Sequence, residues 1–535
     1  MTTNSTLHRG VFFGHSSSLR LVLFALAFVQ YTCRPVSATD YYIDSTSGKD
    51  TNSGTSASAP WQSLPKINST TFQPGDSILL KAGSSWDGQL WPKGSGAPSK
   101  PIRIGRYGDG AKPLIRGNGT VEDAVLLKNQ QYWEIEDLEI TNSGATTATR
   151  RGVHLALEEF GEAHHFVLRR LTVHNVSGRD DTKDNGGITY TCWGKNKLSR
   201  FVDLLIEDNQ IYHTDRNGIS GWTEPWERSK WFPSLQVVIR GNHLRDIGGD
   251  GMMIVETDGA LIERNTVAYA NQRSVGYNIA IWTWSADNSI IQFNEAYGTK
   301  GQRDGEGFDS DWNSRNTLIQ YNYSHDNEGG FVLICNEGGF KPSDSAGNVG
   351  TIVRYNISQN DGHRGVTISG PVQDTLVYNN TFFVGPEQNS DVVLMTDWAG
   401  WPSNTAFLNN IFFVRGHARI GHAVSRDDKG VHTSAIGLGD SKNTTFDSNV
   451  YFGSINVPEG DLHALTADPL FVSLDKPGMG SDTLRNYTLQ PDSKARRSAA
   501  KVPNNGGKDF LGTSLINCST LDRGAIQSSS CGGTP

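Results

Sequence analysis

The sequence lacks the patterns that mark several common classes of enzyme and binding protein. It contains no Gly-x-Ser-x-Gly segment and no group of His and Cys residues with metal-ligand spacing, so serine-nucleophile and zinc chemistry lack support. Charged residues make up only 19% of the 535, and the formal net charge of −8 argues against a nucleic acid partner. Low charge and 59 Gly residues are typical of a turn-rich β protein with short strands.

The first 38 residues have the pattern of a secretory signal peptide. Arg20 precedes nine apolar residues, 21–29, and Val36-Ser37-Ala38 offers a cleavage site of small residues. Nine apolar residues are too few to cross a membrane. We therefore expect a secreted, extracellular chain without membrane contact after cleavage. Cys518 and Cys531 would then meet an oxidising compartment and are candidates for a disulfide.

A four-residue pattern recurs through the second half of the chain, where an apolar residue is followed three positions later by Asn. From Asn209 to Asn410, successive Asn residues are 23 to 34 positions apart. Such a period without helical patterning predicts stacked coils of a parallel β-helix. The Asn residues of the successive copies are Asn209, Asn242, Asn265, Asn294, Asn322, Asn356, Asn380, Asn410 and, as one further candidate, Asn449.

The recurring Asn is predicted to lie at a bend of each coil and to form a ladder with its neighbours. Its side chain can bond the backbone of the next coil, and Asn tolerates left-handed backbone geometry. Asn322 and Asn356 also begin glycosylation sequons. Because they belong to the ladder, we expect these two to be buried and unmodified.

The chain divides into four predicted parts. Residues 1–38 form the signal peptide, 39–120 an N-terminal cap with the first strands, 121–455 the body of the β-helix, and 456–535 a C-terminal segment that folds back along the body. A solenoid needs such a cap because its end coil exposes apolar core. Leu138 and Leu171 take the place of Asn in the early coils, so the ladder is expected to begin later.

Both ends of the mature chain resemble those of secreted right-handed parallel β-helix carbohydrate-active proteins of the pectate-lyase-like superfamily. The resemblance rests on Tyr42-Ile-Asp44, Gly54-Thr-Ser56, Pro60-Trp61 and Pro74-Gly-Asp76 at the start, and on Asp468-Pro-Leu-Phe471 and Asp522-Arg-Gly-Ala525 at the end. It implies an all-β fold, a single-stranded right-handed parallel β-helix of roughly 10–12 coils. Because this superfamily holds both glycoside hydrolases and polysaccharide lyases, the resemblance does not decide the chemistry.

The segment 304–311 carries four acidic residues in eight positions, Asp304, Glu306, Asp309 and Asp311. Like charges this close repel, so either one acid is protonated at neutral pH or a cation lies among them. Glycoside hydrolysis needs a protonated acid beside an ionised carboxylate. We therefore predict Asp309 and Asp311 as nucleophile or base, with Glu328 from the following coil as the acid.

Aligning the coils on the Gly before each strand predicts what surrounds these acids. Side chains alternate along a strand, and neighbouring coils lie about 4.8 Å apart. This register places Ala280 and Val332 beside Asp309, and it places Trp222 and Trp282 in the column of Asp311. Aromatic faces stack on sugar rings, so these two Trp residues are predicted to bind substrate.

The remaining polar residues near the acidic segment leave alternatives open. Asp250, two coils earlier, is expected to line the same groove. Lys300, His363 and Arg364 would orient hydroxyl groups in a hydrolase, or serve proton abstraction in a polysaccharide lyase or uronan epimerase; Arg364 would alternatively pair with one of the acids. No cofactor is required for hydrolysis, but Asp304 and Glu306 are candidate calcium ligands because oxygen-rich sites suit Ca²⁺.

Three functions follow from these residues. The favoured one is a secreted glycoside hydrolase, monomeric, acting on a polysaccharide or oligosaccharide. The first alternative is a calcium-assisted lyase or epimerase, and the second is a non-catalytic glycan-binding surface protein. The acids outnumber the bases near the predicted site, which favours a neutral glycan over a polyuronate.

Overall fold

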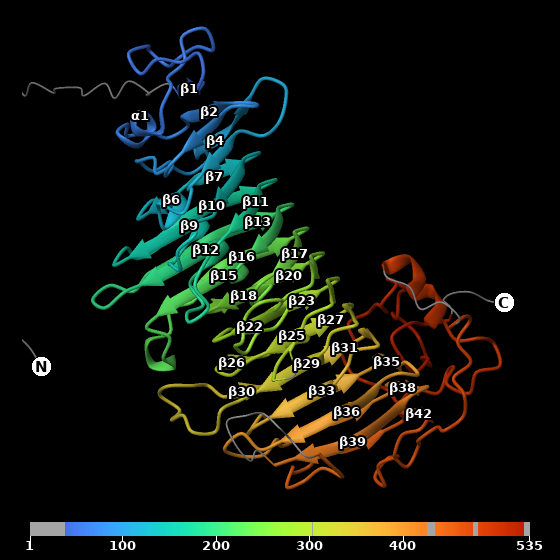
Figure 1. Cartoon of the computed structure of the whole chain (residues 1–535). Coiled ribbons are helices and arrows are strands. Elements are labelled where there is room, and N and C mark those ends of the chain that lie inside the picture. The colour runs from blue at the N-terminus through green and yellow to red at the C-terminus, as the bar shows by residue number, and fades with distance from the viewer. Residues whose placement is uncertain (1–37, 302, 425–433, 475–479, 529–535) are drawn as a thin grey trace, which may run out of the picture. The chain divides into compact units, whose positions relative to one another are not determined.

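The computed structural model describes residues 38–301, 303–424, 434–474 and 480–528, and its regular structure is almost entirely β (Figure 1). Helical structure in these ranges consists of α1 (Leu64–Asn68) and two short 3₁₀ helices, η1 (Arg228–Lys230) and η2 (Ser481–Tyr487). Among the described residues, no helix has the length and apolar character that a membrane span requires. Apart from Ala38, the predicted signal peptide lies outside the described residues.

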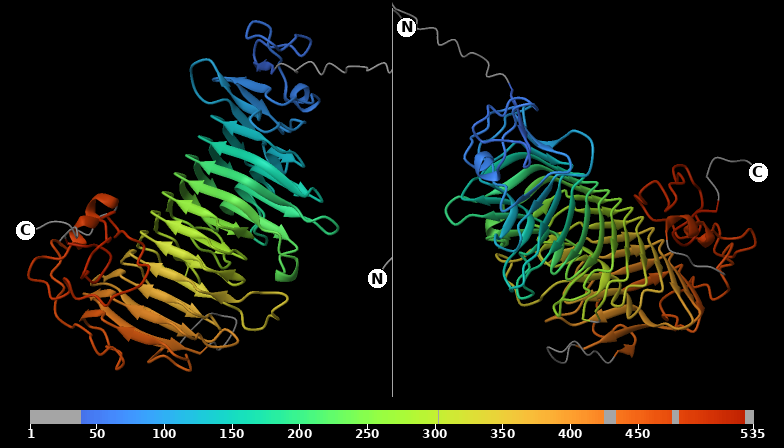
Figure 2. Two further views of the ribbon diagram at one scale, coloured as in Figure 1. Left: turned by 180° about the vertical axis from the view of Figure 1, so that it is seen from behind. Right: turned by 45° about the horizontal axis from the view of Figure 1, so that its top comes forward.

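Three long sheets of stacked strands make up the fold (Figures 1 and 2). Sheet one has 15 strands. These are β1 (Asp40–Ile43), β2 (Ser77–Lys81), β4 (Ile102–Tyr107), β7 (Trp133–Glu136), β10 (Glu162–Arg169), β13 (Arg200–Glu207), β16 (Ser234–Arg240), β19 (Thr257–Asp258), β20 (Leu261–Glu263), β23 (Ile290–Gln292), β27 (Leu318–Gln320), β31 (Ile352–Arg354), β34 (Leu376–Tyr378), β37 (Ala406–Leu408) and β41 (Thr445–Asp447).

Sheet two has 13 strands. They are β3 (Ser85–Asp87), β5 (Leu114–Arg116), β8 (Glu139–Asn142), β11 (Thr172–Val176), β14 (Gln210–Thr214), β17 (His243–Ile247), β21 (Thr266–Ala268), β24 (Glu295–Tyr297), β28 (Tyr323–His325), β32 (Ile357–Gln359), β35 (Thr381–Val384), β38 (Ile411–Val414) and β42 (Val450–Gly453).

Sheet three has 12 strands. They are β6 (Asp123–Lys128), β9 (Arg151–Glu158), β12 (Gly186–Trp193), β15 (Asn217–Glu224), β18 (Met252–Val255), β22 (Ile281–Trp284), β25 (Glu306–Ser310), β29 (Gly330–Cys335), β33 (Arg364–Ser369), β36 (Asn389–Thr396), β39 (His417–Ala423) and β40 (Ala435–Ile436). A further short pair joins β26 (Ser314–Arg315) to β30 (Asn348–Val349).

Strand pairing in the three sheets is parallel except between β39 and β40, and each full coil visits the sheets in turn, as β10, β11 and β12 do. This arrangement confirms the predicted parallel β-helix. The sheets hold more strands than the predicted 10–12 coils because β1 to β5, from the segment expected to form a cap, continue the same stacks.

The apolar residue of the recurring pattern stacks on itself through the core of the coils. Ile206 pairs with Ile239, and the register continues coil by coil to Phe407 and Phe446. The five Ile residues of this column are 0% exposed. Burying one such side chain contributes about 1.5–3 kcal/mol, so the column is a major part of the core.

The predicted Asn ladder runs unbroken beside this column. From Asn209 to Asn449, each side-chain amide donates to the Oδ1 of the next Asn at 2.9–3.0 Å. The last member, Asn449, donates to Asp461 at 2.8 Å. Asn322 and Asn356 are both 0% exposed, so the predicted burial of these two sequon residues is confirmed.

The left-handed backbone at this bend belongs to the residue before each Asn and not to the Asn itself. Gly241 has φ +63°, Arg264 +56° and Tyr355 +50°, each one position ahead of a ladder Asn. The preceding residue reverses the chain, and the Asn then keeps ordinary backbone angles that direct its amide along the stack.

The C-terminal segment packs against the later coils, as predicted (Figure 2). Tyr487 donates from its hydroxyl to Gln359 on β32 at 2.8 Å. Asn379 donates to the carbonyls of Asp522 and Gly524 at 3.0 Å, and Ala525 N–H donates to Thr381 on β35 at 3.0 Å. Cys531 lies outside the described residues, so its pairing with Cys518 stays a prediction.

Candidate active site

The acidic segment lies on the outer face of sheet three. Phe308 of β25 points into the core, and Asp309 points outward between Trp282 of β22 and Leu333 of β29. Asp311 follows directly after the end of β25. The outward direction of both acids, inferred from the alternation of side chains, agrees with this placement.

The predicted neighbours of Asp309 are wrong by one or two positions in the flanking coils. The Gly register had placed Ala280 and Val332 beside it, but the observed partners are Trp282 and Leu333. Two additional residues precede β22. In β29, Phe331 and Val332 both pack into the core, and Val332 rather than Phe331 pairs with Phe308.

Trp222 and Trp282, predicted to share one column of side chains, lie in different columns. Trp222 contacts Trp284, with ring centroids 5.6 Å apart, and does not share a column with Trp282. Trp282 is only 6% exposed, so it does not offer an open stacking face. With Met253, Val255, Ile279, Leu333 and Cys335, these rings form an apolar cluster on the outside of sheet three, joined by Trp226 and Trp312.

The four acidic residues differ in their access to solvent. Glu306 and Asp309 are 0% and 2% exposed, whereas Asp304 and Asp311 are partly exposed. A carboxyl group that reacts with a substrate must be reachable. Exposure therefore favours Asp304 and Asp311 as the reacting groups. The sequence predicted Asp304 only as a calcium ligand.

The apolar surroundings and the mutual repulsion of these groups change their acidity. Burial, followed by the charge of Glu306, raises the pKa of Asp304 to about 8. Burial raises the pKa of Asp311 to about 6, against hydrogen bonds that favour its ionised form. Burial, then the charges of Asp311, Asp304 and Glu306, raises the pKa of Asp309 well above its usual range. Burial also raises the pKa of Glu306, against the charge of Arg364.

Asp311 is held by two donors. The backbone N–H of Trp312 donates to its Oδ1 at 2.7 Å, and the Cys335 thiol donates to the same atom at 2.8 Å. Burial and the neighbouring acids raise the pKa of the Cys335 thiol well above its usual range, so it stays a protonated donor. Asp309 Oδ1, by contrast, is buried without a hydrogen-bond partner among the described residues.

Two cations balance part of the negative charge. The side chain of Arg364 pairs with Glu306 at 3.0 Å, which is the ion pair that the sequence had left open as an alternative. Lys183 comes from the loop before β12 and was not predicted. Its ammonium lies 4.6 Å from the Trp282 ring centroid and 3.0 Å from Asp250. No periodic pattern marked Lys183, because the loops between sheets two and three vary in length.

Asp250 is fully buried and therefore does not line a groove as expected. It accepts from the Trp282 indole at 3.0 Å and from Ile279 N–H at 3.1 Å, and it pairs with Lys183 at 3.0 Å and with Arg216 at 3.4 Å. Its carboxylate thus holds Trp282 and Lys183 in position beside the acids.

Glu328 lies at a turn beside the one that carries Asp304, since Gly329 N–H donates to Gly305 O at 3.0 Å. Glu328 and His363 line a separate cavity of about 340 Å³ at the turns between sheets two and three. The Glu328 carboxylate accepts from Gly301 N–H at 2.9 Å. His363 and Lys300 are exposed. The residues that line this cavity do not include Asp309 or Asp311, so the predicted convergence of Glu328 with the two aspartates is not observed.

One group of potential metal ligands is found in the described part of the chain. Oxygen or sulfur atoms of Asp309, Asp311 and Cys335 lie within 4.8 Å of one another. A thiol is a poor ligand for calcium, which takes oxygen. The predicted calcium ligands Asp304 and Glu306 are not in this group, and the Arg364 pair engages Glu306; calcium there stays a prediction.

Comparisons with known proteins agree with this architecture. No family model matches the chain. It is 27% identical over 580 residues to a lacto-N-biosidase of Bifidobacterium longum subsp. longum, an alignment that covers 90% of this chain and 34% of that protein. The chain thus spans about a third of the length of this relative.

Solved structures give the same fold. A GH136 lacto-N-biosidase from Eubacterium ramulus is 24% identical, with a TM-score of 0.59 over 78% of this chain and 68% of that one. XylC in complex with xylose is 12% identical, with a TM-score of 0.52 over 92% and 99%. The similarities confirm the resemblance to parallel β-helix carbohydrate-active proteins.

Proposed function

We propose that this chain is a glycoside hydrolase that cleaves an oligosaccharide by means of Asp304 and Asp311. The observation that carries the proposal is the difference between their pKa values, about 8 and about 6, at partly exposed positions beside an apolar cluster. A glycosidase needs one protonated and one ionised carboxyl group at the same pH. Between about pH 6 and pH 8 this pair supplies both.

Asp304 is the acid in this mechanism. Its proton passes to the glycosidic oxygen as the bond to the anomeric carbon breaks. Asp311, ionised and oriented by Trp312 and Cys335, attacks the anomeric carbon or removes a proton from the attacking water. Asp309 remains protonated and Glu306 is neutralised by Arg364, so neither opposes the charge of Asp311.

Hydrolysis fits the arrangement better than elimination. A lyase or epimerase needs a free base near the uronate and a cation for its carboxylate. Of the bases proposed for this role, Arg364 is paired with Glu306, and His363 lines a cavity that contains neither Asp304 nor Asp311. The similarity to a lacto-N-biosidase supports an oligosaccharide substrate, with lacto-N-biosides as the first to test.

An assay of the purified chain on a panel of neutral and acidic glycans tests the proposal. Reducing ends should rise without absorbance near ~235 nm, which marks the unsaturated product of a lyase. Asp304→Asn and Asp311→Asn should each lower kcat about 10³-fold, since acid–base groups contribute about 10²–10⁴-fold. An increase in absorbance, or full activity in Asp311→Asn, would refute the proposal.

Glu328→Gln separates the two assignments of the acid. If Glu328 is the acid, as the sequence predicted, this variant should lose activity. If Asp304 is the acid, replacing Glu328 should change the rate by no more than about twofold. A loss as large as that of Asp304→Asn would transfer the role of the acid to Glu328.

We also propose that the chain acts outside the cell as a monomer after removal of residues 1–38. The support is the charged, apolar and small-residue order of the N-terminus. N-terminal sequencing of the secreted protein should begin at Thr39, and light scattering should give the mass of one chain. Retention of residues 1–38 or a dimer mass would contradict the respective part.

A further inference from the structure

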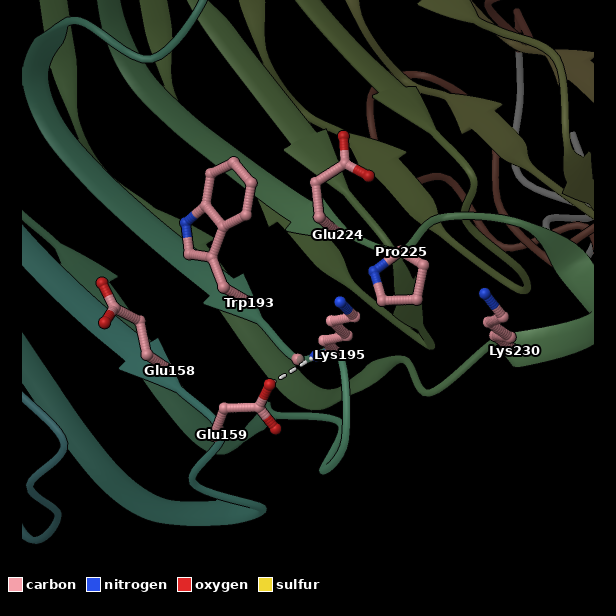
Figure 3. A pocket seen from close by; sticks show the side chains of 8 residues that line it. Glu158, Glu159, Trp193, Lys195, Glu224, Pro225 and Lys230 are labelled. Atoms are coloured by element: carbon pink, nitrogen blue, oxygen red, sulfur yellow. Dashed lines mark hydrogen bonds between the residues drawn. The ribbon is translucent and has the colours of Figure 1, made fainter.

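A second polar and aromatic site lies on sheet three, at the ends of its earlier strands. Glu158, Trp193 and Glu224 are the last residues of β9, β12 and β15, and they are in register with one another. Trp193 therefore stands between two glutamates on neighbouring strands (Figure 3). It is 40% exposed, in contrast to Trp282 at 6% in the acidic cluster.

Trp193 lies where two cavities meet. One, of about 550 Å³, has among its lining residues Glu158, Glu159, Trp193, Lys195, Glu224 and Lys230 (Figure 3). The other, of about 580 Å³, shares Glu158 and Trp193 and continues across β6 and β9 to Trp91. Ligand sites in proteins measure about 300–1,000 Å³, so each cavity has room for a small ligand.

The walls of the first cavity are held in place. The Glu159 carboxylate accepts from the backbone N–H groups of Lys195 at 2.7 Å and Asn196 at 3.0 Å, which fixes the turn that follows Trp193. Lys128 pairs with Glu158 at 2.7 Å. The open face of Trp193 is thus presented by a preorganised frame, which lowers the cost of binding.

The chemistry of this frame matches a neutral sugar. An exposed indole stacks on the apolar C–H face of a pyranose ring, and carboxylates on either side accept hydrogen bonds from its hydroxyl groups. Three glutamates face the positive charges of Lys195, Lys230 and Lys128, so the site has no excess of cations to attract a uronate or a sulfated glycan.

The site is separate from the proposed reaction centre. In the strand order, β15, β18 and β22 lie between β12 and β25. Four steps of about 4.8 Å place Trp193 roughly 19 Å from β25 along the stack, and Glu224 on β15 is one step nearer. Both sit on the same sheet, but the cavities around Trp193 contain none of the four acids of the segment 304–311.

We propose that Trp193, with Glu158 and Glu224, forms a second carbohydrate-binding site that takes a neutral oligosaccharide independently of catalysis. It goes beyond the proposed hydrolase activity, because it requires affinity for glycan without turnover. The site would hold the protein on an extended glycan while the acids act on another stretch.

Binding measured on the full chain carrying Asp311→Asn tests this site without hydrolysis. The probes are cellohexaose, xylohexaose, laminarihexaose and an N-acetyllactosamine hexasaccharide, with hexagalacturonate as the acidic comparison, titrated by calorimetry and Trp fluorescence. At least one neutral hexasaccharide should bind, and hexagalacturonate should not. Adding Trp193→Ala should weaken the affinity about tenfold, as truncation of an aromatic anchor does.

Trp398→Ala is the matched control, because Trp398 is 37% exposed and lies outside both cavities. It should keep the affinity within about twofold. Glu224→Gln should weaken binding while preserving shape, and thermal melting checks that each variant folds. Equal affinity with and without Trp193, binding of hexagalacturonate alone, or no binding of any neutral probe would each overturn the site. Binding with no hydrolysis by the wild-type chain would reject the proposed hydrolase and leave this site standing.

Discussion

At the scale of single residues, the chain concentrates four carboxyl groups on one short strand and in the residues that directly precede and follow it. Ionising all of them would be costly, because Coulomb repulsion is strong where water is excluded. Protonation of Asp309 and the pairing of Glu306 with Arg364 reduce that cost. The two remaining groups, Asp304 and Asp311, keep different protonation states near neutral pH.

The pH dependence of kcat/KM should therefore be bell-shaped. Activity should rise through about pH 6 as Asp311 loses its proton, and fall through about pH 8 as Asp304 loses the proton that it must donate. Initial rates at constant ionic strength between pH 4 and 10 measure both limbs. A profile that is flat from pH 5 to 9 would contradict this assignment of acid and base.

The Cys335 thiol should set the position of the acidic limb. It donates to Asp311 at 2.8 Å and favours the ionised carboxylate. Cys335→Ala removes this donor, so the pKa of Asp311 should rise and the acidic limb should move to higher pH while the alkaline limb stays. Cys192→Ala, at the other buried free thiol, is the control and should leave the profile in place. No movement in Cys335→Ala would show that the thiol only fills space.

The direction of a site residue could be predicted from the sequence only where the alternation of side chains along a strand determines it. The outward direction of Asp309 follows from the apolar core position of Phe308. The neighbours of Asp309 did not follow, because two residues added before β22 and the doubled core residues of β29 shift the register. Lys183 escaped prediction because a loop carries it over Trp282.

At the scale of elements, each coil is tied to the next by a buried amide. Asn356 accepts at Oδ1 from Asn322 N–H and amide, and it donates to Ile319 O and to Asn380 Oδ1, all within 3.0 Å. None of these groups reaches solvent. The ladder thus satisfies polar backbone at a bend where water is absent.

Replacing Asn356 by Ala should lower the free energy of unfolding by about 3 kcal/mol or more, because each buried donor or acceptor left without a partner costs about 1–3 kcal/mol. Denaturant unfolding followed by circular dichroism measures the change. Asn389→Ala, at an exposed Asn of β36, is the matched control and should change stability by less than about 0.5 kcal/mol. A loss below about 1 kcal/mol in Asn356→Ala would mean that the ladder is not a major stabilising feature.

The arrangement of the strands was predicted more completely than the individual site residues. A repeat of 23 to 34 residues that contains both an apolar residue and an Asn at fixed spacing is compatible with few protein folds. The pattern predicted the stacked coils and the Asn ladder, and both are observed. The left-handed geometry that Asn tolerates is adopted here by the preceding residue, such as Tyr355 or Arg264.

At the scale of the whole molecule, one continuous face of sheet three carries both the acidic cluster and the Trp193 site. Solenoids are suited to this, since each coil adds a strip of surface at constant spacing. Loops leaving sheet three can then change the chemistry of one coil without disturbing the core. The sequence predicted the solenoid from its repeats, but the division of its surface into two sites depends on loops that carry no period.

We propose above all that Asp304 and Asp311 hydrolyse a glycosidic bond. Mass spectrometry of the products formed in water enriched in oxygen-18 tests this most directly, with Asp311→Asn measured alongside. One heavy oxygen should appear at the new reducing end, and the variant should form no product in the same time. An unlabelled, unsaturated product, or labelled product formed equally fast by Asp311→Asn, would contradict it.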